Sequence, residues 1–334
     1  MMKKTLVALA AVAVTGGAFA QAVMTGSIGY AYVQSQTSAG VTSSGIGKDD
    51  ASLMFAISED IEGLGKLSSS MGIGLNTTDK ATVGKDMSIK LDMGATGAIK
   101  LSSEMGTNYV SQGVGSVGSA AYASMAIGDS VSGVGVFSTR SYQDVISYKL
   151  PLSESLSVSA AHSENADGTT NTSGEGKGAA GYGNTGDYQR YNTYSVDYKT
   201  GALTLNAGYR TYDMAQNATG NKNTRNRAAA AYDLGVAKIG AAYEQTTYTY
   251  GNTLLDTLVA VSVPLGQVTL SAQWGNQTKA GNASSTSDTS YAGSMYNLSY
   301  ALSKRTSVVG TYITNQSSGS SNPNATVIWL THSF

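Results

Sequence analysis

The sequence has no cysteine, only 3 prolines and few charges, and it has no long apolar run beyond its first twenty residues. Without cysteine, neither a disulfide framework nor a thiolate site can form. Charged residues make up 13% of the chain, against about 25% in ordinary soluble domains. No later segment offers the roughly 20 consecutive apolar residues that a membrane helix needs. These absences leave a polar disordered chain, or a β-barrel whose apolar residues are spread one in two.

The residues that are abundant argue against disorder. Hydrophobic residues reach 41% and there are 21 tyrosines, a content that a disordered chain rarely has. The net charge of −1 and the lack of a basic tract predict no nucleic-acid partner. With His162 and His332 as the only histidines, the sequence predicts no metal and no cofactor. A β-barrel without disulfides gains its rigidity from backbone pairing as the sheet closes.

The first twenty residues have the order of a secretory signal. Lys3 and Lys4 precede the apolar run TLVALAAVAV, and a small-x-small end, Ala18-Phe19-Ala20, comes just before Gln21. The apolar run is too short to span a bilayer. We therefore expect cleavage between Ala20 and Gln21, export of the chain, and a single mature domain covering residues 21–334.

Apolar and polar residues alternate through much of that domain, for example at 203–210, 238–244, 268–274 and 296–302. A period of two is typical of strands with one apolar face. In a soluble sandwich this face points to a core, and in a membrane barrel it points to lipid. Single segments do not separate these two interpretations, but the connections between them do.

Short and long connections alternate along the chain. The short ones are 62–66, 94–97, 150–155, 199–201, 233–236, 264–266 and 303–306, and the long polar ones are 34–50, 76–85, 106–139, 164–190, 213–224, 276–293 and 314–324. Short periplasmic turns and long external loops are typical of outer-membrane barrels, as is an even strand number. The sequence therefore predicts an all-β protein, a transmembrane antiparallel β-barrel of about 16 strands.

Most tyrosines fall at or near the ends of the predicted strands. Their positions are 30, 32, 109, 148, 194, 198, 209, 212, 232, 243, 296, 300 and 312. Such rings form aromatic girdles at the two lipid–water interfaces of a barrel. The alternative is that tyrosine is simply a good strand former.

Several segments resemble the general-porin family of β-proteobacteria. The matching motifs are SEDIEGLGK (58–66), the Tyr148-x-x-Pro151 turn, YDLGVAKIGAAYEQ (232–245), VSVPLGQ (261–267), YALSKRT (300–306) and the terminal THSF. They occur in the expected order across the mature chain. The resemblance implies a homotrimeric pore of sixteen strands in the outer-membrane lipid, with a long third external loop, here 106–139, folded into the lumen. It also implies that the barrel assembly machinery reads the terminal Phe334.

The chain departs from this family in its basic residues. Family members carry arginine in the strand before SED and in the closing strand, where this chain has Ser52, Ala56, Thr331 and Ser333. The arginine expected before the third loop is replaced by Lys100. The resemblance therefore implies a pore with a weakened preference for anions.

Alternation predicts which charges face the lumen. The candidate constriction residues are Lys100, Glu104, Asp129 and Arg140, and the basic pore-lining candidates are Lys90, Lys149, Arg210, Arg225, Arg227 and Lys238, accompanied by the acids Asp92, Asp197, Asp233 and Glu244. Opposed charges in a narrow lumen create a field that selects ions. Charges at strand ends in bulk water would instead have no such effect.

The leading hypothesis is an outer-membrane channel for the passive diffusion of small hydrophilic solutes and ions, with weak selectivity. A channel specific for a neutral solute is one alternative, and a non-conducting adhesin or structural barrel is another. An enzyme would need catalytic groups to converge, and the local cluster around His162, with Ser163 and Glu164, does not establish this. We therefore expect no catalysis.

Overall fold

The computed structural model describes residues 21–36, 39–75, 82–105, 142–165, 189–214, 222–248, 253–280, 289–317 and 324–334. The predicted signal peptide with Ala20, the predicted constriction loop 106–139, and the candidates Asp129 and Arg140 lie outside the described residues.

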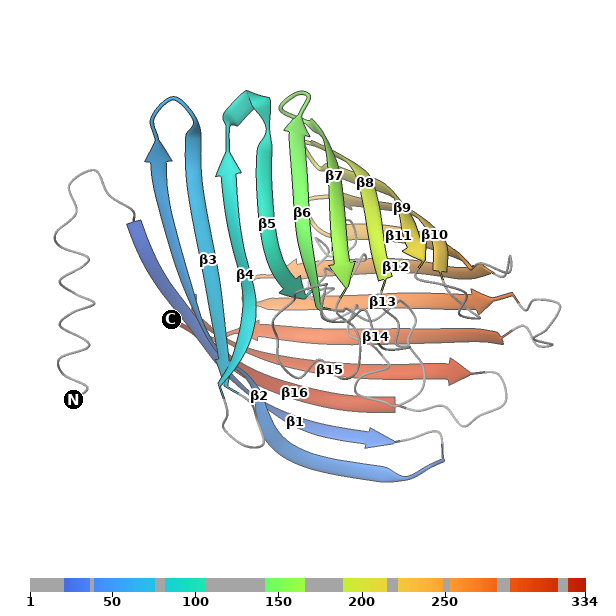
Figure 1. The fold of residues 1–334 in the computed structure, drawn as a ribbon. Coiled ribbons are helices and arrows are strands. Elements are labelled where there is room, and N and C mark those ends of the chain that lie inside the picture. The colour runs from blue at the N-terminus through green and yellow to red at the C-terminus, as the bar shows by residue number, and fades with distance from the viewer. Residues whose placement is uncertain are drawn as a thin grey trace, which may run out of the picture.

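Within the described residues, sixteen strands form one closed antiparallel barrel (Figure 1). Each strand pairs with the next along the chain, and β1 pairs with β16. The strands are β1 (Gln21–Gln36), β2 (Thr42–Ile61), β3 (Gly65–Leu75), β4 (Thr82–Asp92), β5 (Ala98–Met105), β6 (Tyr142–Pro151), β7 (Leu156–Asn165), β8 (Gln189–Thr200), β9 (Leu203–Met214), β10 (Lys222–Asp233), β11 (Lys238–Tyr248), β12 (Thr253–Leu265), β13 (Val268–Lys279), β14 (Thr289–Ala301), β15 (Thr306–Ser317) and β16 (Asn324–Ser333). The predicted fold class and strand number are confirmed.

The short connections predicted from the sequence all fall at hairpin turns, and the one at Gly94–Thr96 is a 3-10 helix. The turn after β10 shows the local chemistry. The Asp233 side chain accepts a hydrogen bond from the Gly235 backbone at 2.8 Å. Gly235 has a φ of 81°, which a side chain would disfavour. The sequence of this turn therefore fixes where β10 ends.

The predicted long connection at 34–50 is wrong in extent. Strand β1 continues to Gln36 and β2 already begins at Thr42, with Gln36 opposite Thr42. This stretch is polar and rich in glycine and serine, a composition that predicts a loop. A neighbouring strand in register supplies backbone partners regardless of that composition, so the hairpin extends beyond the sequence-based boundary.

Side-chain exposure divides each strand into an outer and an inner face. In β16, Ile328 and Leu330 are 47% and 49% exposed, whereas Trp329 between them is 6% exposed. Exposed apolar side chains cover the outer face in the other strands too, including Leu205, Leu270 and Leu298. The inner face mixes polar side chains with buried apolar ones such as Val327 and Trp329. The apolar outer face is what a strand barrel in lipid requires, and a soluble sandwich would bury that face instead.

The barrel closes where the end of the chain meets β1. Gly26 and Phe334 exchange two backbone hydrogen bonds of 2.9 Å each. The Phe334 ring lies against Gly26, so that a Cβ on this glycine would be 2.5 Å from the ring atom Cζ and 2.9 Å from the Ser52 carbonyl oxygen. Glycine at position 26 therefore makes room for the terminal ring at the seam of the sheet.

Exposed tyrosine and tryptophan side chains encircle most of the outer face. They belong to Tyr30, Tyr32, Tyr148, Tyr194, Tyr209, Tyr232, Tyr243, Trp274, Tyr296, Tyr300 and Tyr312. Tyr212 does not belong to this group. It is 7% exposed and occupies an inner position of β9, on the opposite face of the strand from Tyr209. Tyr109 lies outside the described residues. The four consecutive strands β2–β5 contain no tyrosine or tryptophan, so the aromatic belt is interrupted there.

Candidate functional site

The inner wall carries the charges that alternation predicted to face the lumen. Every basic candidate that falls within the described residues occupies an inner-face position of its strand, including Lys100 of β5, Lys149 of β6 and Arg210 of β9. These residues thus come together on one surface. The sequence did not predict which of these residues contact one another across neighbouring strands.

Most of these cations are paired with a carboxylate. Lys90 contacts Asp92 at 2.7 Å, Lys100 contacts Glu104 at 2.6 Å, Lys149 contacts Asp197 at 3.0 Å, and Lys238 contacts Asp233 at 3.6 Å. All four pairs are partly exposed, so water and salt screen them. Each pair presents a dipole to the lumen rather than a free charge.

A buried cluster of charges lies on β10 and β11. Arg225 Nε and Arg227 Nε each lie 3.1 Å from a different carboxylate oxygen of Glu244. The three side chains are 6%, 8% and 2% exposed, respectively. Removing one partner from a buried pair leaves an uncompensated charge and costs about 3–5 kcal/mol. We call Arg225, Arg227 and Glu244 the buried triad; it fixes the register of two strands and is shielded from solvent.

Arg210 is held differently. Its Nε donates a hydrogen bond of 2.9 Å to Thr193 Oγ1, and its guanidinium lies over the Tyr191 ring, 3.9 Å from the ring centroid. Tyr191 itself is 4% exposed and packs against Tyr212 with ring centroids 5.5 Å apart. Among the described residues, no carboxylate lies within ion-pair distance of Arg210.

Sequence reasoning missed a buried acid of this wall, Asp256 of β12. It is fully buried, lies directly opposite Glu244, and accepts a hydrogen bond of 2.7 Å from Gln277 Nε2. Its alternation with the outward Leu255 and Thr257 was a usable signal, since a lone acid in an otherwise apolar segment stands out. A row of polar groups thus crosses β10–β13 at one level of the wall.

Other polar groups on this side are buried as well. Asp256 Oδ2, Gln273 Oε1 and Asn297 Nδ2 have no hydrogen-bond partner among the described residues, and all three side chains are at most 5% exposed. The inner faces of β5 and β6 are more open, with Lys100 and Lys149 side chains 36% and 55% exposed. Solvent therefore reaches the wall of β5 and β6 more easily than that of β12–β14.

The two histidines do not form a catalytic site. His162 occupies an outer position, opposite the exposed Ile146, and bonds Asn192 Oδ1 through Nδ1 at 2.9 Å. Ser163 points to the inner face and is 2% exposed, so neighbours in sequence lie on opposite sides of the sheet. His332 bonds Thr306 Oγ1 at 2.9 Å. In the part of the chain that the structure describes, no group of three His, Asp or Glu side chains is arranged to hold a metal.

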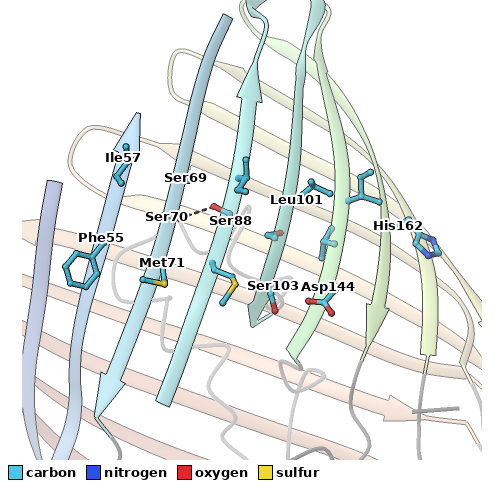
Figure 2. Close-up of a pocket in the computed structure, with 15 residues that line it drawn as sticks. Phe55, Ile57, Ser69, Ser70, Met71, Ser88, Leu101, Ser103, Asp144 and His162 are labelled. Atoms are coloured by element: carbon cyan, nitrogen blue, oxygen red, sulfur yellow. Dashed lines mark hydrogen bonds between the residues drawn. The ribbon is translucent and has the colours of Figure 1, made fainter. Parts of the chain in front are cut away.

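The outer face is hollowed where the aromatic belt is interrupted. Figure 2 shows the groove, of about 700 Å³, with Phe55, Met71 and Leu101 projecting from three different strands and His162 at one end. Its lining is mainly apolar and includes residues of β2–β7. It lies on the opposite side of the sheet from the charged wall.

Comparison with known proteins decides the family. Residues 5–320 match the profile described as Gram-negative porin. The chain belongs to the Gram-negative porin family. Porins are channel proteins without catalytic activity, so this chain is an outer-membrane channel for small solutes and is not an enzyme.

Solved porin structures share the fold at low sequence identity. The anion-selective porin from Comamonas acidovorans is 17% identical, with 94% of this chain and 100% of that chain covered and a TM-score of 0.66. OmpT of Vibrio cholerae in its trimer form is 13% identical, with 95% and 100% covered and a TM-score of 0.67. A mutant Rh. blastica porin is 13% identical, with 94% and 100% covered and a TM-score of 0.58. No curated protein sequence is similar enough to count as a relative.

Proposed function

We propose that this porin is a weakly selective channel through which small hydrophilic solutes diffuse passively. The observation that carries the proposal is charge pairing on the inner wall: of the seven basic candidates within the described residues, six contact a carboxylate. A paired wall charge has little field beyond a screening length of about 8 Å at physiological salt. Cations and anions therefore meet similar barriers, with a small preference for anions from the unpaired Arg210.

The constriction remains assigned to Lys100 and Glu104 together with Asp129 and Arg140 of the segment outside the described residues. Lys100 and Glu104 form a tight pair, which supports weak rather than strong selectivity at that level. Signal cleavage between Ala20 and Gln21 and recognition of Phe334 by the assembly machinery belong to the same proposal. The Phe334 ring at the seam supports the latter, since the chain end completes the sheet.

We also propose a homotrimer whose subunits meet through the outer face of β2–β5 and its groove. This face lacks the interfacial aromatic rings found around most of the rest of the barrel. Its methionines, Met71 and Met87, are adaptable packing residues. The polar His162–Asn192 pair on the outer face is costly in lipid and is better covered by protein. OmpT of Vibrio cholerae is described in a trimer form, which supports the proposed trimer.

Recording from the purified protein in a planar bilayer tests the proposal. We expect a conductance that is ohmic, rises with salt without saturating, and closes in three equal steps, one for each subunit pore. Saturation or blockade by one neutral solute would instead favour a solute-specific channel. Absence of conductance would overturn the channel assignment and favour a surface adhesin or structural barrel.

A further inference from the structure

The strand register brings two arginines face to face on the inner wall. Arg210 of β9 and Arg225 of β10 are directly opposite partners, and Arg227 is the next inner residue along β10. Like charges directly opposite each other destabilise a sheet. Counting Glu244 and Asp256, this patch still has three cations against two acids. Stability alone does not explain such an arrangement, and breaches of local rules occur at functional sites.

The two arginines of β10 are already ion-paired within the buried triad. Both Nε groups are directed to Glu244, and Arg225 Nε also lies 3.1 Å from Thr246 Oγ1. Their side chains are at most 8% exposed and cannot reach a passing solute. Arg210 is half-buried and carries the excess charge of the patch. It is the cation of this cluster that solvent can reach.

The surroundings of Arg210 hold its guanidinium in one orientation. One face rests on Tyr191, with Tyr212 at 5.9 Å from the guanidinium carbon, and Nε is engaged by Thr193. The edge formed by the two Nη groups has no protein partner among the described residues. A guanidinium fixed in this way loses little entropy when it binds, and its fork matches the two oxygens of a carboxylate.

We propose that Arg210, positioned by Tyr191 and Thr193, is a carboxylate-binding subsite in the pore wall that favours small organic carboxylates over halide ions. The inference rests on the channel function proposed above and adds a solute class to it. The two oxygens of a carboxylate each accept a near-linear hydrogen bond from a different Nη group, whereas a halide ion is a single centre that both N–H groups reach only with bent contacts. The positive excess of the neighbouring triad draws either anion to the wall, so the discrimination comes from the fork geometry.

The test is the acetate-to-chloride permeability ratio, measured from reversal potentials with acetate on one side of a bilayer and chloride on the other. In Arg210→Gln we expect the ratio to fall by about threefold to tenfold, because a charge-assisted bidentate contact is lost. In Arg210→Lys we expect a similar fall, since a lysine keeps the charge without the planar fork. The matched control is Arg305→Gln, the same chemical change in the turn before β15, which should keep the wild-type ratio.

Each outcome decides the proposal. An unchanged ratio in Arg210→Gln would overturn it, and a wild-type ratio in Arg210→Lys would show that a point charge suffices and overturn the carboxylate geometry. If Arg210→Gln gives no channels, the lysine variant alone decides. A fall in Arg305→Gln of the same size would show a general charge effect and count against the subsite. If the wild-type protein itself showed no conductance, the channel function would be contradicted instead.

Discussion

Leu298→Arg is expected to destabilise the barrel, because an arginine on the lipid face costs about 2–4 kcal/mol at the bilayer midplane and less toward the interface. Leu298 is 50% exposed on the outer face and lies between Tyr296 and Tyr300 of the same strand. Urea titration of the barrel in phospholipid vesicles measures the change in the free energy of unfolding.

The neighbouring Ser299→Arg is the matched control. Ser299 is on the inner face and is partly exposed, so a new arginine there can remain in water. We expect its effect to be much smaller than that of Leu298→Arg. If both variants lost the same stability, the assignment of outer and inner faces would be inverted or the barrel would not stand in lipid.

Gly26→Ala is expected to impair closure of the barrel. The added methyl would overlap the Phe334 ring, at 2.5 Å from Cζ, and crowd the Ser52 carbonyl. Overpacking of this kind costs about 1–3 kcal/mol, and at the seam it also threatens the two backbone hydrogen bonds between Gly26 and Phe334. The folded fraction after refolding into vesicles, and the urea midpoint, report the loss.

Gly310→Ala provides the control for this substitution, because nothing lies within 4 Å of the added Cβ. It should cost little. Combining Gly26→Ala with Phe334→Ala removes the ring that causes the clash, so the double variant should lose less stability than the sum of the single changes. Full additivity would show that Phe334 is not the obstacle. A refolding defect in Gly310→Ala equal to that in Gly26→Ala would show general sensitivity to loss of glycine.

Local signals explain how much of the fold could be predicted. The alternation at 268–274 sets which side chains face outward, and the turn at Asp233 and Gly235 ends a strand by its own chemistry. These features depend on residues close in sequence. The continuation of β1 to Gln36 depends on a neighbouring strand, and so sequence composition misjudged it.

The sequence predicted on which face of the sheet each candidate residue lies, but not which other residue it contacts. Alternation of inner and outer positions alone predicts that Lys149 and Asp197 lie on the inner wall. Their contact, however, depends on the register that brings strands β6, β7 and β8 together. Alternation also predicts that Asn206 is open to the lumen. In the structure Asn206 is 4% exposed, and its side-chain amide donates a hydrogen bond to Asp197. The stacking of Arg210 on Tyr191 likewise follows from neighbouring strands rather than from either sequence segment.

The reversal potential of the open channel in a potassium chloride gradient tests the central claim, that pairing of wall charges leaves the pore weakly selective. For the wild type we predict a small potential with the sign of a slight anion preference. Glu104→Gln removes the partner that lies 2.6 Å from Lys100, so the potential should move toward the equilibrium potential of chloride. A wild-type potential close to the equilibrium potential of either ion, and unmoved by Glu104→Gln, would contradict the account.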